Sequence, residues 1–148
     1  MRGKTWKLAA VTLGLSISAA AAVYAQTPGW SLTGEGWRYM SVEGQYQAAR
    51  WFQDTDGRWY HFDQNGIMQT GWFQDNRKWY YLAADGSMQT GWMTLGGNTY
   101  YFDSDGSMHT GWLLDNGKWY YFAPDTGMMV RGTSVGGYYL NSDGVWVH

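Results

Sequence analysis

Tryptophans at a nearly constant spacing constrain the fold of this chain more than any other feature of its sequence. The tryptophans that open successive units lie 20 or 21 residues apart: Trp30, Trp51, Trp72, Trp92 and Trp112. Such regular self-similarity is typical of repeat architectures. A second tryptophan follows seven or eight positions later in four of these units, and Thr99 takes its place in the remaining one. We therefore divide residues 26–148 into six units that begin near residues 29, 50, 71, 91, 111 and 132, the last of them degenerate.

Each unit has the sequence of a β-hairpin. In the third unit, residues 72–74 predict a short strand, residues 75–77 a turn, and residues 79–82 a second strand rich in aromatic side chains. Isolated two-stranded hairpins are only marginally stable in water, so consecutive units must cover one another. We expect an all-β solenoid of stacked β-hairpin repeats of about 20 residues each.

Strand alternation divides the side chains of each unit between two faces. Trp79 and Tyr81 fall on one face, and Tyr80 and Leu82 on the other. We expect the second face to form the core, from these residues: Phe52, Phe73, Met93, Leu113, Phe62, Leu82, Phe102 and Phe122. The chain has 11 Trp, 12 Tyr and 5 Phe. The first face therefore has more aromatic residues than a solvent-exposed face ordinarily carries. We interpret it as a binding face.

The segment from Gly71 to Trp92 resembles a known repeat. It runs Gly-Trp, then Trp-Tyr-Tyr-Leu, then Asp-Gly-Ser-Met-Gln-Thr-Gly-Trp, and is similar to the choline-binding, or cell-wall-binding, repeat of bacterial surface proteins. Residues 50–68 are similar too, and the resemblance extends over essentially all of residues 26–148. It implies a superhelix of hairpins with ligand sites between consecutive units. Each site takes two tryptophans from one unit and the second tyrosine of the next, with a methionine nearby.

The chemistry of choline agrees with such sites, because a quaternary ammonium has no hydrogen-bond donor and is held best by electron-rich aromatic faces. Three sites are predicted to be complete: Trp51, Trp59 and Tyr81 with Met68; Trp72, Trp79 and Tyr101 with Met88; and Trp112, Trp119 and Tyr139 with Met128 or Met129. Two weaker candidates are Trp30 and Trp37 with His61, and Trp92 with Tyr121, where Thr99 replaces a wall. A protonated His61 would repel a cation, so that site should weaken as pH falls. The predicted function is binding to choline residues of envelope polymers of the teichoic-acid type.

The N-terminal residues have the layout of a secretory signal peptide. Arg2, Lys4 and Lys7 precede an uncharged run from Leu8 to Val23, and the small residue Ala25 ends the segment. A membrane anchor is the alternative, but the run is short for a span. We expect residues 1–25 to be cleaved, and the repeats to be secreted and held on the bacterial cell surface, with no membrane partner after cleavage.

Other functions fit the sequence less well. Binding of glucan or another cell-surface polysaccharide by the same aromatic repeats is the main alternative, since aromatic faces also stack on sugars. We expect no catalytic residues, metal site or cofactor, because the chain has no Cys, only three His, and no catalytic motif. Acidic segments such as residues 54–57 lack calcium-loop spacing and fit turns instead. A formal net charge of −2 argues against nucleic acid as a partner.

Overall fold

The computed structural model describes residues 27–147, so the predicted signal peptide lies outside the described residues. Within this range the chain forms strands, turns and bends, and the predicted all-β hairpin solenoid is confirmed. The strands are β1 (Gly29–Leu32), β2 (Trp37–Met40), β3 (Arg50–Gln53), β4 (Trp59–Phe62), β5 (Gly71–Asp75), β6 (Lys78–Leu82), β7 (Gly91–Leu95), β8 (Asn98–Phe102), β9 (Gly111–Asp115), β10 (Lys118–Phe122), β11 (Thr133–Val135), β12 (Tyr138–Leu140) and β13 (Trp146–Val147). No helix in residues 27–147 is long and apolar enough to span a membrane.

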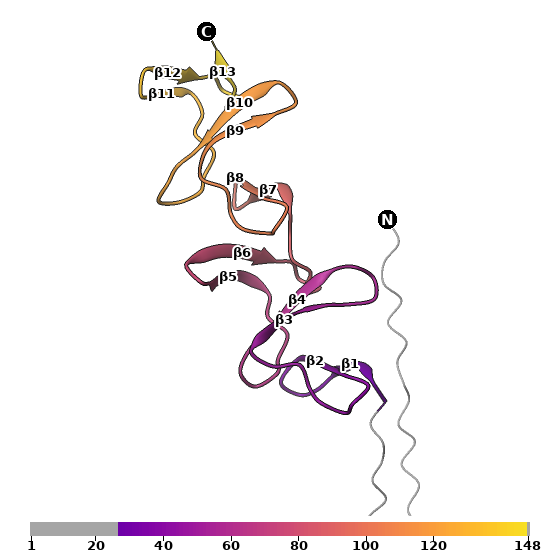
Figure 1. Cartoon of the computed structure of the whole chain (residues 1–148). Helices are drawn as coiled ribbons and strands as arrows, with labels where there is room; N and C mark the ends of the chain where they lie inside the picture. The colour runs from indigo at the N-terminus through magenta and orange to yellow at the C-terminus, as the bar shows by residue number, and fades with distance from the viewer. Residues whose placement is uncertain (1–26, 148) are drawn as a thin grey trace, which may run out of the picture.

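Consecutive strands pair into antiparallel hairpins, and β13 adds a third strand to the last one. The hairpins follow one another along the molecule, from β1–β2 at the bottom of the view to β11–β13 at the top (Figure 1). No hydrogen-bonded ladder joins one named hairpin to the next in the described part of the chain. Side-chain packing and single backbone contacts must therefore hold the stack together.

Two-residue turns with positive φ close the central hairpins. Asn76 and Arg77 have φ values of 47° and 66°, and Gly96 and Gly97 have 56° and 82°. Positive φ at both central residues is the type I′ geometry, whose twist matches that of the flanking strands. Arg77 adopts this conformation without the freedom of glycine, which costs about 1 kcal/mol.

The hairpins stack front to back. In the third hairpin, Trp72 pairs with Tyr81 and Phe73 with Tyr80. We call the side with Trp72, Trp79 and Tyr81, and its equivalents, the front face, and the side with Phe73, Tyr80 and Leu82 the back face. The Trp51 ring of the preceding hairpin lies 5.7 Å from Phe73 and 4.9 Å from Tyr80. The division of residues between faces was predicted correctly. The separation into a core face and a binding face was wrong, because every front face but the last meets the back face of the next hairpin.

The deepest side chains come from the ends of the second strands. Phe62, Leu82, Phe102 and Phe122 are fully buried, as predicted, and Leu140 is buried with them. The other predicted core residues are half-buried: Phe52, Phe73, Met93 and Leu113. They lie on the first strands of their hairpins.

Methionine and glycine lock successive units together. A Cβ atom added to Gly106 would lie 2.3 Å from the Sδ of Met88, and one added to Gly127 would lie 2.3 Å from the Sδ of Met108. Both glycines also have positive φ, at 82° and 67°. The methionine of one unit thus fills the space that only glycine leaves open in the next.

Candidate functional site: the aromatic junctions

Each contact between consecutive hairpins brings together four equivalent positions, and we call each such group a junction. The five junctions are, in order, Trp30, Trp37, Tyr60 and Met68; Trp51, Trp59, Tyr80 and Met88; Trp72, Trp79, Tyr100 and Met108; Trp92, Thr99, Tyr120 and Met129; and Trp112, Trp119, Tyr138 and Trp146. The first-strand tryptophan lies 4.7–5.4 Å from the tyrosine of the next unit in all five. The same geometry therefore recurs along the stack.

The third junction encloses a hollow. Trp72 and Trp79 meet at 86° with ring centroids 6.3 Å apart, and Tyr100 lies 5.1 Å from Trp72. Met108, Asp125 and Thr126 complete the lining of a cavity of about 390 Å³. Both tryptophans keep 41% of their surface exposed. Perpendicular aromatic walls with open faces can surround a compact cation on several sides.

Backbone hydrogen bonds explain why a methionine reaches each of the first four junctions. The Met108 N–H donates to the carbonyl oxygen of Trp79 at 2.7 Å. Met108 also forms an isolated antiparallel bridge with Phe102, at the end of its own hairpin. The same N–H hydrogen bond joins Met68 to Trp37, Met88 to Trp59 and Met129 to Thr99, each at 2.8 Å. Each methionine thus lies beside the second-strand residue of the preceding hairpin.

The fifth junction replaces the methionine with Trp146. Trp112 and Trp119 meet at 85° with centroids 6.4 Å apart, and Tyr138 lies 5.4 Å from Trp112. Trp146 lies 6.4 Å from Trp112 and 5.5 Å from Tyr138. It pairs with Leu140 on β12, at the position where other units place their methionine. This junction is the one with four aromatic residues among those described.

The second junction has all three aromatic residues, and a histidine packs beside them. Trp51 lies 4.9 Å from Tyr80, and Trp59 remains 40% exposed. The His61 ring packs 5.1 Å from Trp51 and 4.1 Å from Phe73, and its Nδ1 is hydrogen-bonded to Gln69 Oε1.

The first and fourth junctions are poorer candidate sites than the other three. The first is packed: Tyr60 and Met68 are buried, and Trp30 and Trp37 pack against that cluster. The fourth has Trp92 and Tyr120 at 4.7 Å, but Thr99 provides no aromatic wall.

A protein-family model accounts for this recurring arrangement. The choline-binding repeat model matches residues 50–90 and 89–134, which is more than half of the chain. The chain belongs to the choline-binding repeat family.

Solved structures of pneumococcal choline-binding proteins have the same fold. The crystal structure of choline binding protein F from Streptococcus pneumoniae matches with a TM-score of 0.76 at 39% identity, over 82% of this chain and 41% of that one. CbpJ from Streptococcus pneumoniae TIGR4 matches with a TM-score of 0.76 at 41% identity, over 82% and 41%. A pneumococcal cell-wall endolysin from phage Cp-1, solved with choline, matches with a TM-score of 0.60 at 35% identity, over 81% and 37%. This chain thus spans less than half the length of each. No curated protein matches it.

In these choline-binding repeats, the tyrosine that joins each junction differs from the predicted one by one residue. The prediction named Tyr81, Tyr101, Tyr121 and Tyr139, whereas the structure brings in Tyr80, Tyr100, Tyr120 and Tyr138. The predicted tyrosines lie on the front face. Tyr81 packs on Trp72 of its own hairpin at 5.4 Å, and Tyr139 is 48% exposed. Because hairpins stack front to back, a junction takes its tyrosine from the back face of the next unit.

The predicted methionines and His61 are displaced in the same way. Met68 lies in the first junction rather than beside Trp51, and Met88 lies in the second rather than beside Trp72. Met129, not Met128, occupies the bridging position opposite Phe122. His61 packs in the second junction instead of meeting Trp30 and Trp37. The predicted pH response of the first junction therefore has no geometric basis.

Aspartates hold three of the first-strand indoles in place. The indole N–H groups of Trp30, Trp51 and Trp92 donate to Asp54, Asp75 and Asp115 of the next unit at 2.9–3.0 Å. Sequence reasoning placed these aspartates in turns and missed this role. The corresponding residues at the third and fifth junctions are Leu95 and Val135, which have no side-chain acceptor. At the two junctions with perpendicular tryptophans, no aspartate of the next unit therefore anchors the first-strand indole N–H.

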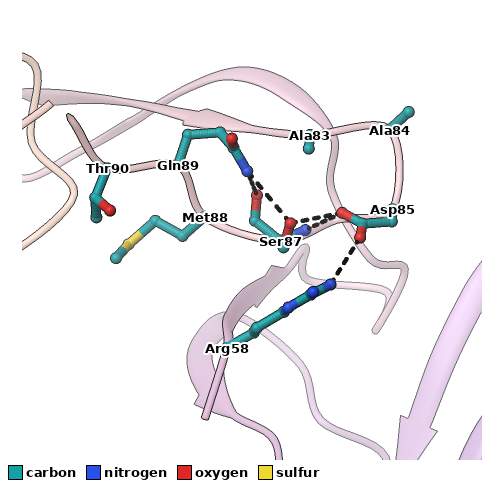
Figure 2. A pocket seen from close by; sticks show the side chains of 8 residues that line it. All are labelled: Arg58, Ala83, Ala84, Asp85, Ser87, Met88, Gln89 and Thr90. Atoms are coloured by element: carbon teal, nitrogen blue, oxygen red, sulfur yellow. Dashed lines mark hydrogen bonds and ion pairs between the residues drawn. The ribbon is translucent and has the colours of Figure 1, made fainter. Parts of the chain in front are cut away.

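A second, wider hollow lies beside the stack and contains no aromatic side chain. It measures about 610 Å³ and is lined by Arg58, Ala83, Ala84, Asp85, Ser87, Met88, Gln89 and Thr90. Figure 2 shows Arg58 reaching from its own hairpin to Asp85 in the loop of the next, where the two groups pair at 3.1 Å. The Ser87 hydroxyl donates to Asp85 at 2.6 Å, and the Gln89 amide donates to the Ser87 carbonyl at 3.1 Å. The polar groups that line this hollow thus form hydrogen bonds and an ion pair with one another, and the ion pair links two adjacent units.

The same ion pair recurs one unit later. Lys78 pairs with Asp105 at 3.0 Å. The Ser107 hydroxyl, the Ser107 N–H and Lys78 all donate to Asp105, which lowers the pKa of its carboxyl from 3.8 to about 2. The pKa of Lys78 is raised by the same contact. Across residues 27–147, no cluster of His, Cys, Asp and Glu could hold a metal ion.

Proposed function

We propose that these repeats bind choline residues of a bacterial cell-wall polymer at the junctions, with the third and fifth as the principal sites. The observation that carries the proposal is the third junction, where Trp72, Trp79, Tyr100 and Met108 surround a hollow of about 390 Å³. The second junction has the same aromatic set and is proposed as a further site. The first is packed and the fourth lacks a wall, so neither is proposed as a strong site.

The affinity of one site follows from its walls. An aromatic face contributes roughly 0.5–1.5 kcal/mol to holding a quaternary ammonium, so three faces give about 2–4 kcal/mol. That corresponds to millimolar affinity or weaker for free choline. Several sites on one chain, engaging a polymer that carries many cholines, would bind far more tightly through effective concentration.

The solved relatives support this ligand. The phage Cp-1 endolysin structure is a complex with choline, and choline binding protein F was crystallised in the presence of a peptidoglycan analogue. The presence of a cell-wall endolysin among the relatives also agrees with secretion of this chain to the bacterial surface. Mass spectrometry of the protein recovered from a secreting host should find Gln26 at the mature N-terminus.

Intrinsic tryptophan fluorescence tests the proposed ligand. The protein is titrated with choline and, separately, with an α-glucan oligosaccharide. A choline response that saturates in the millimolar range supports the proposal. A glucan response without a choline response would overturn it in favour of polysaccharide binding. The feature that favours this alternative is Thr99, which stands where other units have a tryptophan.

Two variants test which tyrosine forms the third site. Tyr100→Leu removes the ring that the structure brings to Trp72, and Tyr101→Leu removes its neighbour on the other face. Choline binding at the third junction should weaken about tenfold in the first variant and little in the second. Circular dichroism should show that both keep the fold; the reverse order of effects would restore the tyrosine predicted from sequence.

A further inference from the structure

A series of ion pairs between consecutive units ends after two members in the described part of the chain. Arg58 pairs with Asp85 and Lys78 pairs with Asp105, and each pair spans 27 residues. The next members at this spacing are Asn98 and Asp125. Asn98 has no charge, so the third carboxylate has no cation where the first two have one.

Asp125 lies in a loop that differs from those before it. The Gly106 N–H donates to the carbonyl of Asp103, three residues back, whereas the Gly127 N–H donates to that of Ala123, four residues back. The longer loop places Asp125 and Thr126 in the lining of the third junction. The described residues contain no hydrogen bond or ion pair to the Asp125 carboxylate, and the side chain is exposed.

The third junction therefore combines two properties. Its aromatic walls suit a quaternary ammonium, and an aspartate without a counterion among the described residues, Asp125, is part of the lining of the same hollow. In the two earlier loops the residue before the glycine is Asp85 or Asp105, which contacts Arg58 or Lys78. In this loop Thr126 holds that position, and Asp125 comes one residue before it.

We propose that Asp125 determines specificity at the third junction by selecting a cationic ligand over a neutral ligand of the same shape. This inference rests on the proposed function. A ligand ammonium supplies Asp125 with the kind of cationic partner that Arg58 and Lys78 give to Asp85 and Asp105. The interaction is between a solvent-exposed charge and a bound cation, so it is modest and screened by salt.

The expected contribution is about two- to fivefold in affinity at low ionic strength, the range typical of exposed charge pairs. Aromatic walls alone attract choline and also bind apolar surface, so they discriminate less between a trimethylammonium and a tert-butyl group. The carboxylate attracts only the first of these.

Nuclear magnetic resonance of the indole N–H groups can isolate this junction. The Trp79 signal is followed during titration with choline and with 3,3-dimethyl-1-butanol, its neutral isostere, at low salt and at 0.5 M NaCl. In Asp125→Asn, choline should bind two- to fivefold more weakly at low salt, with little difference at 0.5 M, and the neutral alcohol should bind as before. The Trp119 signal, from the fifth junction, is the internal control and should not change.

A second variant leaves the carboxylate in place and supplies its missing cation. Asn98→Lys should reproduce the loss of choline affinity by extending the series to a third pair. Unchanged choline affinity in Asp125→Asn, or an equal loss for both ligands, would overturn the inference. If the Trp79 signal of the unmodified protein ignores choline altogether, the proposed function fails first and this inference fails with it.

Discussion

The third and fourth junctions are neighbours built on the same backbone, yet only the third has two tryptophan walls. The methionine N–H donates to the second-strand carbonyl at 2.7 Å in one and 2.8 Å in the other. The first-strand tryptophan meets the tyrosine of the next unit at 5.1 and 4.7 Å. The main difference is that Trp79 in one junction corresponds to Thr99 in the other.

This comparison separates two roles within one repeat. Stacking depends on the first-strand tryptophan, the tyrosine of the next unit and the methionine, since these contacts persist where Thr99 replaces a tryptophan. The second-strand tryptophan adds an open aromatic wall without altering the stack. It is therefore the residue that most directly distinguishes a junction proposed to bind choline from a purely structural one.

The largest expected effect comes from breaking the methionine lock of the third junction. In Gly127→Ala the new Cβ would lie 2.3 Å from the Sδ of Met108, so we expect a loss of about 2–3 kcal/mol in stability. Gly117→Ala is the matched control, with a similar φ of 75° and nothing within 4 Å, and should lose only about 1 kcal/mol. Thermal unfolding measures both; equal losses would show that the methionine contact is unimportant.

The next effect converts the third junction into a copy of the fourth. Trp79→Thr should weaken choline binding at the third junction about tenfold, because one of its aromatic walls is removed. The Trp72 indole N–H signal reports this binding. Trp79 is 41% exposed, so the thermal midpoint should move little, and a fall as large as that of Gly127→Ala would mean that Trp79 serves packing instead.

The reverse change should give a smaller gain. Thr99→Trp supplies the missing wall of the fourth junction, and we expect choline to bind there about fivefold more tightly. The gain is smaller than the loss at the third junction because the new side chain must be ordered at the surface. The Trp92 indole N–H signal measures it, with the Trp79 signal as control. No gain would show that the junction differs in more than its wall.

The smallest effect concerns the two hairpin turns. The hairpin of the third junction turns through Asn76 and Arg77, and that of the fourth through Gly96 and Gly97, all with positive φ. Arg77→Gly should stabilise the protein by about 0.5 kcal/mol, because relief of the left-handed strain exceeds the entropy cost of glycine. Asn76→Gly should change less, since asparagine tolerates this conformation. A destabilised Arg77→Gly would instead reveal a contact made by the arginine side chain.

The sequence predicted the repeat period, the hairpins and the residues of each face, because strand alternation and turn chemistry are local properties. The tryptophans of the junctions follow from the same pattern. The closing tyrosine does not, since alternation says which side of a strand Tyr100 lies on and not which hairpin covers that side. Front-to-back stacking decides this, and it is a property of two units together.

Trp146 was missed for a different reason. The last unit has no tryptophan in its first strand and was predicted only to close the site before it. An alignment of residues 143–146 with residues 105–108 would have shown that Trp146 occupies the position equivalent to Met108. The proposed role of Asp125 could not be predicted from the repeat pattern either, because it depends on a loop that is one residue longer.

The third junction draws its lining from three successive units: Trp72 and Trp79 from one, Tyr100 and Met108 from the second, and Asp125 and Thr126 from the third. A candidate site of this kind is not contained within a single repeat, and a peptide with fewer than three units would lack part of it. Duplication of an internal repeat, in contrast, creates a complete new site in one step, because each added unit supplies its own walls and closes those of its neighbour. The number of binding sites in such arrays can thus grow through recombination between repeats, without any new residue having to arise by point mutation.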